Sequence, residues 1–94
     1  MSVLGKIQQQ IKENHILLYM KGTPQSPQCG FSARVVEALS KAEKTFATVD
    51  ILANPDVRKE LPKLTHCETF PQMFIDGKWI GGYKEIFSII KMNF

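Results

Sequence analysis

The chain has 94 residues, of which 44% are hydrophobic and 22% are charged. This length fits one domain spanning residues 1–94, and the composition excludes an intrinsically disordered chain. Twelve Lys and Arg residues against nine Asp and Glu residues give a net charge of +3 without any basic run, so nothing in the charge pattern predicts nucleic-acid binding.

The longest apolar run, residues 16–20, is far too short to cross a membrane, and the first ten residues hold no long apolar stretch. We therefore expect a cytoplasmic protein that has no membrane association. In that reducing compartment the two cysteines, Cys29 and Cys67, are expected as free thiols rather than as a disulfide.

The first half of the chain predicts alternating helices and strands. Apolar residues at helical spacing, with Ser2 as the N-cap, predict a helix over 2–13. Residues 15–20 predict a buried strand, and the Gly- and Pro-containing segment 21–28 predicts a loop. A second helix begins at Gly30 and reaches Ala42, and residues 46–50 predict the next strand.

The third predicted helix begins with Asn54 as the N-cap and Pro55 at the first helical position. Pro62 is expected to kink or end this helix, because proline lacks the N–H that an interior position needs. The residues expected to face inward are Val57, Leu61 and Leu64.

A hairpin and a last helix complete the chain. Residues 73–75 and 78–80 predict two strands around the turn Asp76-Gly77, and Gly81-Gly82 is expected to break the second strand. The last helix begins near Tyr83 and is expected to bury Ile86, Phe87 and Ile90.

The predicted order is α-β-α-β-α-β-β-α. The first β-α-β crossover makes its strands parallel, whereas the hairpin is antiparallel. We therefore predict an α/β fold in which helices flank a four-stranded mixed sheet.

Cys29 lies where the loop turns into the second helix. A thiol at a helix start meets the positive end of the helix dipole and unpaired backbone N–H groups, and both favour the thiolate. Cys29 is therefore a candidate nucleophile or metal ligand, with a buried core cysteine as the alternative. A Cys-x-x-Cys pair would carry its second sulfur at position 32, which is Ser32, so this motif cannot close a disulfide within itself.

The element order resembles the thioredoxin fold, and the residues resemble the monothiol glutaredoxins most closely. Their Cys-Gly-Phe-Ser signature stands here as residues 29–32. Further matching segments follow in order along nearly the whole chain: 16–22, 49–51, Arg58, 61–62, 69–72, 76–77 and 81–82.

The resemblance implies that Cys29 and glutathione jointly hold a 2Fe-2S cluster at the centre of a homodimer. Such clusters favour four thiolate ligands, and in that family each subunit and each glutathione supplies one. For glutathione, the resemblance implies carboxylate binding by Lys21 and Arg58. It also implies main-chain pairing at Phe70, before a proline that resembles the family's cis-proline. The main chain at Tyr83 and Lys84 would then receive the glutamyl carboxylate.

Two positions depart from the family pattern. Lys84 replaces an aspartate, and is expected to repel the ammonium group of glutathione. Cys67-Glu68 stands where Trp-Pro is common, which leaves Cys67 as a resolving thiol for Cys29, a spare ligand or an incidental substitution. A zinc set that combines both cysteines with His15 and His66 matches no known spacing.

Three functions follow from the resemblance. The first is a carrier that assembles a 2Fe-2S cluster and transfers it to apo iron–sulfur proteins. The second is a glutathione-dependent thiol-disulfide oxidoreductase in which Cys29 is the nucleophile; monothiol members resemble cluster proteins more than efficient reductases, so this activity is expected to be weak. The third is an interaction module that forms heterodimers with BolA-type proteins.

Overall fold

The computed structural model describes residues 2–92, and within them the elements follow the predicted order. Met1, Asn93 and Phe94 of the expected 1–94 domain lie outside the described residues. The elements are α1 (Val3–Glu13), β1 (Ile16–Met20), α2 (Gly30–Lys41), β2 (Ala47–Asp50), α3 (Pro55–Thr65), β3 (Gln72–Ile75), β4 (Lys78–Gly81) and α4 (Tyr83–Lys91).

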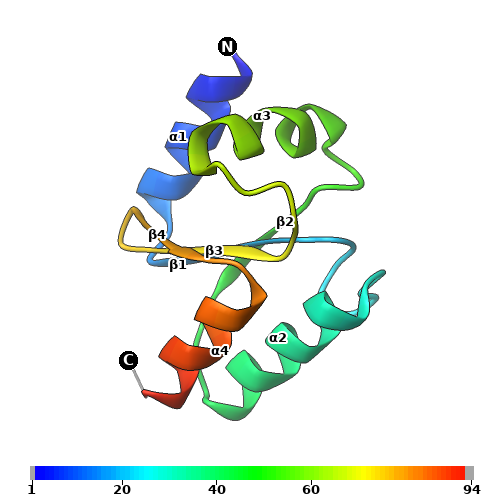
Figure 1. Ribbon diagram of the computed structural model, residues 1–94, viewed down its shortest axis with the longest axis vertical. Helices are drawn as coiled ribbons and strands as arrows, with labels where there is room; N and C mark the ends of the chain where they lie inside the picture. The colour runs from blue at the N-terminus through cyan, green and yellow to red at the C-terminus, as the bar shows by residue number, and fades with distance from the viewer. Residues whose placement is uncertain (1, 93–94) are drawn as a thin grey trace.

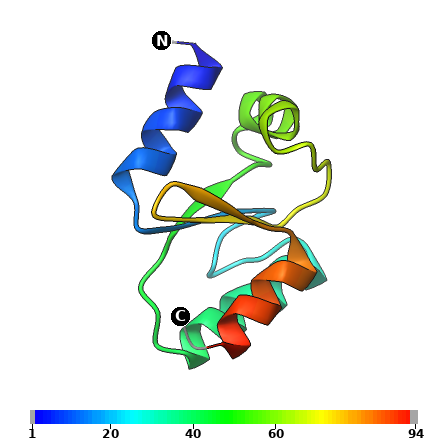
Figure 2. The same ribbon diagram turned by 60° about the vertical axis from the view of Figure 1, so that its left-hand side comes forward.

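The four strands form one mixed sheet in the order β2-β1-β3-β4. β1 is parallel to β2 and antiparallel to β3, and β3 and β4 form the antiparallel hairpin. Helices α1 and α3 cover one face of the sheet, whereas α2 and α4 cover the other (Figure 1). The same two layers are visible after the rotation in Figure 2. The predicted α/β architecture is therefore confirmed.

β1 is the centre of the core because all five of its residues are buried. Side chains alternate across a strand, so Leu17 and Tyr19 join the cluster beneath α1 and α3. Ile16, Leu18 and Met20 join the cluster beneath α2 and α4. The hydrophobic run that predicted a buried strand thus supplies both cores.

The two predicted N-caps have different outcomes. Ser2 caps α1 through its Oγ, which accepts a hydrogen bond from the Gly5 N–H at 3.0 Å. Asn54 occupies the N-cap position of α3, but its side chain makes no capping bond. Its Nδ2 donates to the Asp50 carbonyl at 2.9 Å and its Oδ1 accepts from Lys6 at 3.2 Å. The position of this cap was predicted correctly, but its bonding was not.

Of the two outcomes expected at Pro62, a kink or an end, helix α3 excludes the end, and it also corrects the expectation for Leu64. It runs to Thr65 and therefore does not end at Pro62; the Pro62 carbonyl still accepts the His66 N–H at 2.8 Å, which closes the last turn. Leu64 is 45% exposed rather than inward. The inward stripe follows a spacing of four residues, which buries Thr65 instead.

The hairpin and last helix largely agree with expectation. Asp76 and Gly77 both have positive φ, 50° and 80°, as the two central residues of a type I′ turn require. Gly81 is the last residue of β4, so only Gly82 interrupts the chain before α4. Within α4, Ile86 is buried, whereas Phe87 and Ile90 are partly buried against the α2 side of the sheet.

Candidate functional site

Cys29 occupies the N-cap position of α2, directly after the loop 21–28. Its side chain makes no capping hydrogen bond, so the sulfur does not serve as an ordinary helix cap. The Cys29 residue is half-buried and its thiol is free. The structure therefore presents a thiol at a helix start, as the sequence predicted.

The loop before Cys29 is held in place by Gly22. Its φ is +89°, and a Cβ there would lie 2.5 Å from the Ser26 carbonyl oxygen and 2.7 Å from the Gln28 nitrogen. The Gly22 N–H donates to Asp50 Oδ1 at 2.9 Å. Only glycine fits this conformation and this space, so Gly22 ties the loop to the end of β2.

Ser32 is fully buried beneath Cys29. Its Oγ accepts a hydrogen bond from the backbone N–H of Lys21 at 3.2 Å, and its side chain also hydrogen-bonds the sulfur of Cys29. The sequence showed only that a second thiol was missing here. In the structure the hydroxyl links the end of β1 to the first turn of α2.

These surroundings hold the pKa of the Cys29 thiol below its ordinary value. Partial burial alone would raise that pKa. Hydrogen bonds from the backbone N–H groups of Ser32 and Phe31, the Ser32 side chain and the positive charge of Lys21 together outweigh the burial. The site thus favours the thiolate, the form that attacks disulfides and ligates metals.

Three hollows lie at this site, and Cys29 lines the first of them. The thiol pocket is lined by Cys29, Gly30, Phe31 and Arg34. The central pocket is lined by Phe31, Cys67, Thr69, Phe70, Gly82, Tyr83, Lys84 and Glu85. The α3 groove is lined by Arg58, Lys59, Pro62, Lys63, His66, Glu68 and Phe70. Phe31 lines the first two hollows and Phe70 lines the last two, so the three hollows are neighbours in a row.

Five of the six candidate site residues line this row of hollows, and Lys21 does not. Lys21 acts on Cys29 through its charge. Arg58 shares the α3 groove with Phe70, and Tyr83 and Lys84 share the central pocket with Phe70. The Phe70–Pro71 peptide is cis, and Phe70 lies outside the ladder between β1 and β3, which begins at Gln72.

The start of α4 contains a residue that sequence reasoning missed. Glu85 Oε1 accepts the Gly82 N–H at 2.9 Å, and Glu85 also lines the central pocket. A glutamate three residues after the N-cap is one half of a capping box, so the spacing from Gly82 was a usable signal. Glu85 follows Lys84 directly in the sequence, and both residues line the central pocket. The expectation for Lys84 did not take this neighbouring carboxylate into account.

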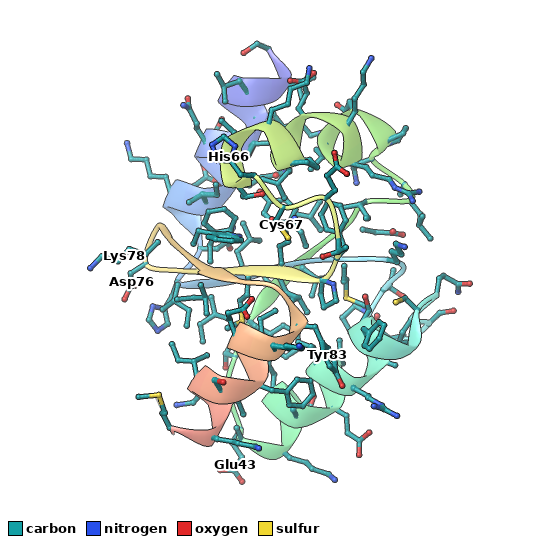
Figure 3. The ribbon with its side chains drawn as sticks, viewed as in Figure 1. Glu43, His66, Cys67, Asp76, Lys78 and Tyr83 are labelled. Atoms are coloured by element: carbon teal, nitrogen blue, oxygen red, sulfur yellow. The ribbon has the colours of Figure 1, made fainter. Side chains whose placement is uncertain are left out.

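Tyr83 directs its side chain toward α2 (Figure 3). Its ring packs edge-on against Phe31, with centroids 4.5 Å apart, and against Phe87 at 4.9 Å. Its hydroxyl accepts a hydrogen bond from Arg34 Nη1 at 3.3 Å. Tyr83 thus joins the start of α2, which lines the thiol pocket, to the start of α4, which lines the central pocket.

Cys67 lies on the segment between α3 and β3, next to His66 (Figure 3). Its Sγ contacts the carbonyl oxygen of Thr69 at 3.6 Å and would lie 4.0 Å from a Cβ placed on Gly82. Cys67 therefore faces the central pocket. Among residues 2–92, no three His, Cys, Asp or Glu side chains are grouped to hold a metal ion.

The chain matches the family described as Glutaredoxin over residues 16–80. The chain belongs to the glutaredoxin family. This glutaredoxin is 56% identical over 91 residues to Glutaredoxin 4 of Buchnera aphidicola subsp. Schizaphis graminum, covering 97% of the chain and 85% of the relative. It is also 57% identical over 81 residues to Glutaredoxin 4 of Escherichia coli K12, and this match covers 86% of the chain and 70% of the relative.

Two solved structures show the same fold. The solution structure of a monomeric truncated mutant of Trypanosoma brucei 1-C-Grx1 has a TM-score of 0.84 at 27% identity, over 98% of this glutaredoxin and 84% of that chain. The solution structure of reduced poplar apo GrxS14 has a TM-score of 0.79 at 34% identity, over 97% and 84%. The expected thioredoxin-like glutaredoxin fold is therefore confirmed. Within residues 2–92, no helix is long and apolar enough to span a membrane.

Proposed function

We propose that this glutaredoxin is of the monothiol type and binds glutathione in the row of hollows beside Cys29. The site offers cations to an anionic tripeptide at Lys21, Arg58 and Lys84. The first-turn N–H groups of α4 provide further donors for a carboxylate. The main chain of Tyr83 and Lys84 then binds the glutamyl carboxylate, and Lys21 and Arg58 bind the glycyl carboxylate. The cysteinyl part, between them, pairs with the main chain of Phe70.

We propose further that the protein assembles a 2Fe-2S cluster, carries it and transfers it to apo iron–sulfur proteins. The observation that supports this most is the stabilised Cys29 thiolate with a hydroxyl at Ser32 in place of a second thiol. A 2Fe-2S cluster takes four ligands, typically thiolates. One subunit offers Cys29 alone from this motif, so a homodimer and two glutathione molecules complete the set.

Reconstitution tests this proposal. The full chain is incubated anaerobically with iron and sulfide, with and without glutathione, and visible absorption and molecular mass are recorded. We expect a coloured dimer only when glutathione is present, and none with Cys29→Ser. Cys67→Ser is the matched control and should still assemble the cluster. A wild-type protein that stays colourless and monomeric with glutathione would contradict the proposal.

The lowered pKa of Cys29 also supports a second candidate function, deglutathionylation. The Cys29 thiolate attacks the glutathione sulfur of a mixed disulfide, and the substrate thiolate leaves. A second glutathione thiolate then attacks the Cys29–glutathione disulfide, which releases oxidised glutathione and restores Cys29. A coupled assay on a glutathione mixed disulfide measures the turnover, and a rate indistinguishable from Cys29→Ser would exclude this function.

BolA-type proteins are the proposed heterodimer partners. Titrating the cluster-loaded protein with such a partner distinguishes this role from simple carriage, because a heterodimer changes both the molecular mass and the visible spectrum. Unchanged mass and spectrum would exclude it.

A further inference from the structure

The α3 groove is larger than one carboxylate needs. Its volume is about 790 Å³, against about 330 Å³ for the central pocket. In the proposed function, glutathione contacts only two of the residues that line this groove: Arg58, at one end, and the main chain of Phe70. From Arg58 to His66 the helix rises through eight residues, or about 12 Å at about 1.5 Å per residue. Glutathione, which ends at its glycyl carboxylate, leaves this length of groove unused.

The unused part of the groove is cationic. Arg58, Lys59 and Lys63 line it with a single carboxylate, Glu68. Within residues 2–92 neither Arg58 nor Lys59 forms an ion pair. Lys63 is held 3.1 Å from Glu60 but remains 64% exposed. The groove therefore presents cations to whatever lies beyond the glycyl position.

The groove also continues the edge on which an extended ligand would lie. Phe70 lines both the central pocket and the α3 groove. A polypeptide that pairs with the main chain of Phe70 and points its cysteine toward Cys29 would pass into the groove. At about 3.3 Å per residue of extended chain, about four residues cover the distance from Arg58 to His66.

We propose that the α3 groove binds a protein partner through an acidic segment on the C-terminal side of the partner's cysteine. The direction rests on the proposed function, in which the glycyl end of glutathione, its C-terminus, lies at Arg58. Carboxylates that follow the cysteine then lie beside Lys59 and Lys63. A neutral segment, or an acidic one before the cysteine, would not have these contacts.

Three synthetic peptides test this inference on the full chain by fluorescence anisotropy. Each carries one S-methylated cysteine, with four glutamates after it, four glutamates before it, or four glutamines after it. We expect the first to bind about five-fold tighter than the other two at low salt, and this advantage to disappear near 0.5 M salt, because exposed charges are screened.

Charge-neutralising variants locate the effect. Lys59→Gln with Lys63→Gln should remove the advantage of the first peptide. Lys12→Gln with Lys78→Gln, which removes the same charge, should keep it, because neither side chain lines the α3 groove. Lys12 lines a separate hollow beside the hairpin turn, and Lys78 begins β4 after that turn. Equal losses in both double variants, or no loss in the first, would overturn the inference.

Glutathione binding separates this inference from the proposed function. Lys59 and Lys63 are not assigned to the glutathione site, so their double variant should bind glutathione within about three-fold of wild type. If wild type binds no glutathione, the proposed function fails. If it binds glutathione but prefers no acidic peptide, only the inference about the groove fails.

Discussion

Helices α2 and α4 lie side by side on one face of the sheet, and both of their starts border the candidate site (Figure 1). Each begins without a side-chain cap at its N-cap residue. At α2 the electron-rich group at the positive end is the Cys29 sulfur, whereas at α4 it is the protein's own Glu85 carboxylate. One helix start thus activates a group that faces ligands. At the other, Glu85 occupies the N–H of the N-cap residue Gly82, and the first-turn N–H groups are the ones proposed to receive a ligand carboxylate.

The backbone of the two starts differs even more than their side chains. Gly81, just before α4, has φ +133°, and a Cβ there would lie 2.6 Å from Cβ of Glu85. Gly30, the first residue of α2, has nothing within 4 Å of its Cβ position. The start of α4 is therefore built tightly around glycine, whereas the start of α2 is open. Four predictions test this contrast, from the largest effect to the smallest.

Gly81→Ala should cause the largest decrease in the free energy of unfolding. The positive φ costs about 1–3 kcal/mol for a residue with a side chain, and the overlap with Glu85 adds to it. Gly30→Ala should instead raise the free energy of unfolding by about 0.5–1 kcal/mol, because alanine favours helix. Urea denaturation measures both changes. Similar effects of the two substitutions would contradict the contrast.

Ser32→Ala should lower the free energy of unfolding by about 1–3 kcal/mol, because the Lys21 N–H loses its acceptor in a partly buried place. It should also raise the pKa of Cys29 toward that of a free thiol, since a hydrogen bond to the sulfur is lost. The rate of alkylation by iodoacetamide as a function of pH measures this shift. Ser40→Ala, an exposed substitution in the same helix, should leave both quantities unchanged; if Ser32→Ala does so too, the link is refuted.

Glu85→Gln and Glu85→Ala separate charge from hydrogen bonding at the start of α4. The glutamine still accepts the Gly82 N–H and loses only the charge at the helix N-terminus, which is worth about 0.3–1 kcal/mol. The alanine also loses the hydrogen bond, so it should be about 1 kcal/mol less stable than the glutamine variant. Thermal and urea unfolding report the difference. Equal stability of the two variants would mean that the bond to Gly82 contributes nothing.

The pH dependence of stability should show a small contribution from Cys29. Because the folded state holds the pKa of this thiol below its unfolded value, the unfolded state binds more protons between the two values. The stabilisation is complete above the unfolded pKa, near 8.5, and is lost as the pH falls through the folded pKa. Subtracting the Cys29→Ser profile from that of wild type isolates it, and a flat difference would show that the pKa is not lowered.

The element order and the mixed sheet were predictable because each rests on local signals. The local signals are the apolar run at residues 16–20, the Asp76-Gly77 turn and the Ser2 cap, and each acts within a few residues of chain. The inward stripe of α3 was not, because whether Leu64 or Thr65 faces the core depends on how the helix rotates against the sheet. Asn54 likewise bonds Asp50 and Lys6, which reach it only in the folded chain.

The candidate site was predictable to the same degree. The position of Cys29 at a helix start followed from the loop and the helical face beside it. The hydroxyl of Ser32 as an acceptor for Lys21 did not, because that bond joins residues brought together by the β1–α2 crossover. The contact between Arg34 and Tyr83 could not be predicted either, because these residues are 49 positions apart in the sequence.

The side chain at position 32 is fully buried, so a bound ligand does not contact the atom that decides whether the site has one thiol or two. An oxygen-to-sulfur exchange, Ser32→Cys, would leave the outer surface of the thiol pocket as it is. The new sulfur would take the place of the hydroxyl that bonds the Cys29 sulfur, so it could attack a disulfide that joins a partner to Cys29. Recognition and the fate of the bound sulfur are therefore set by different atoms, and either property can be changed while the other is retained.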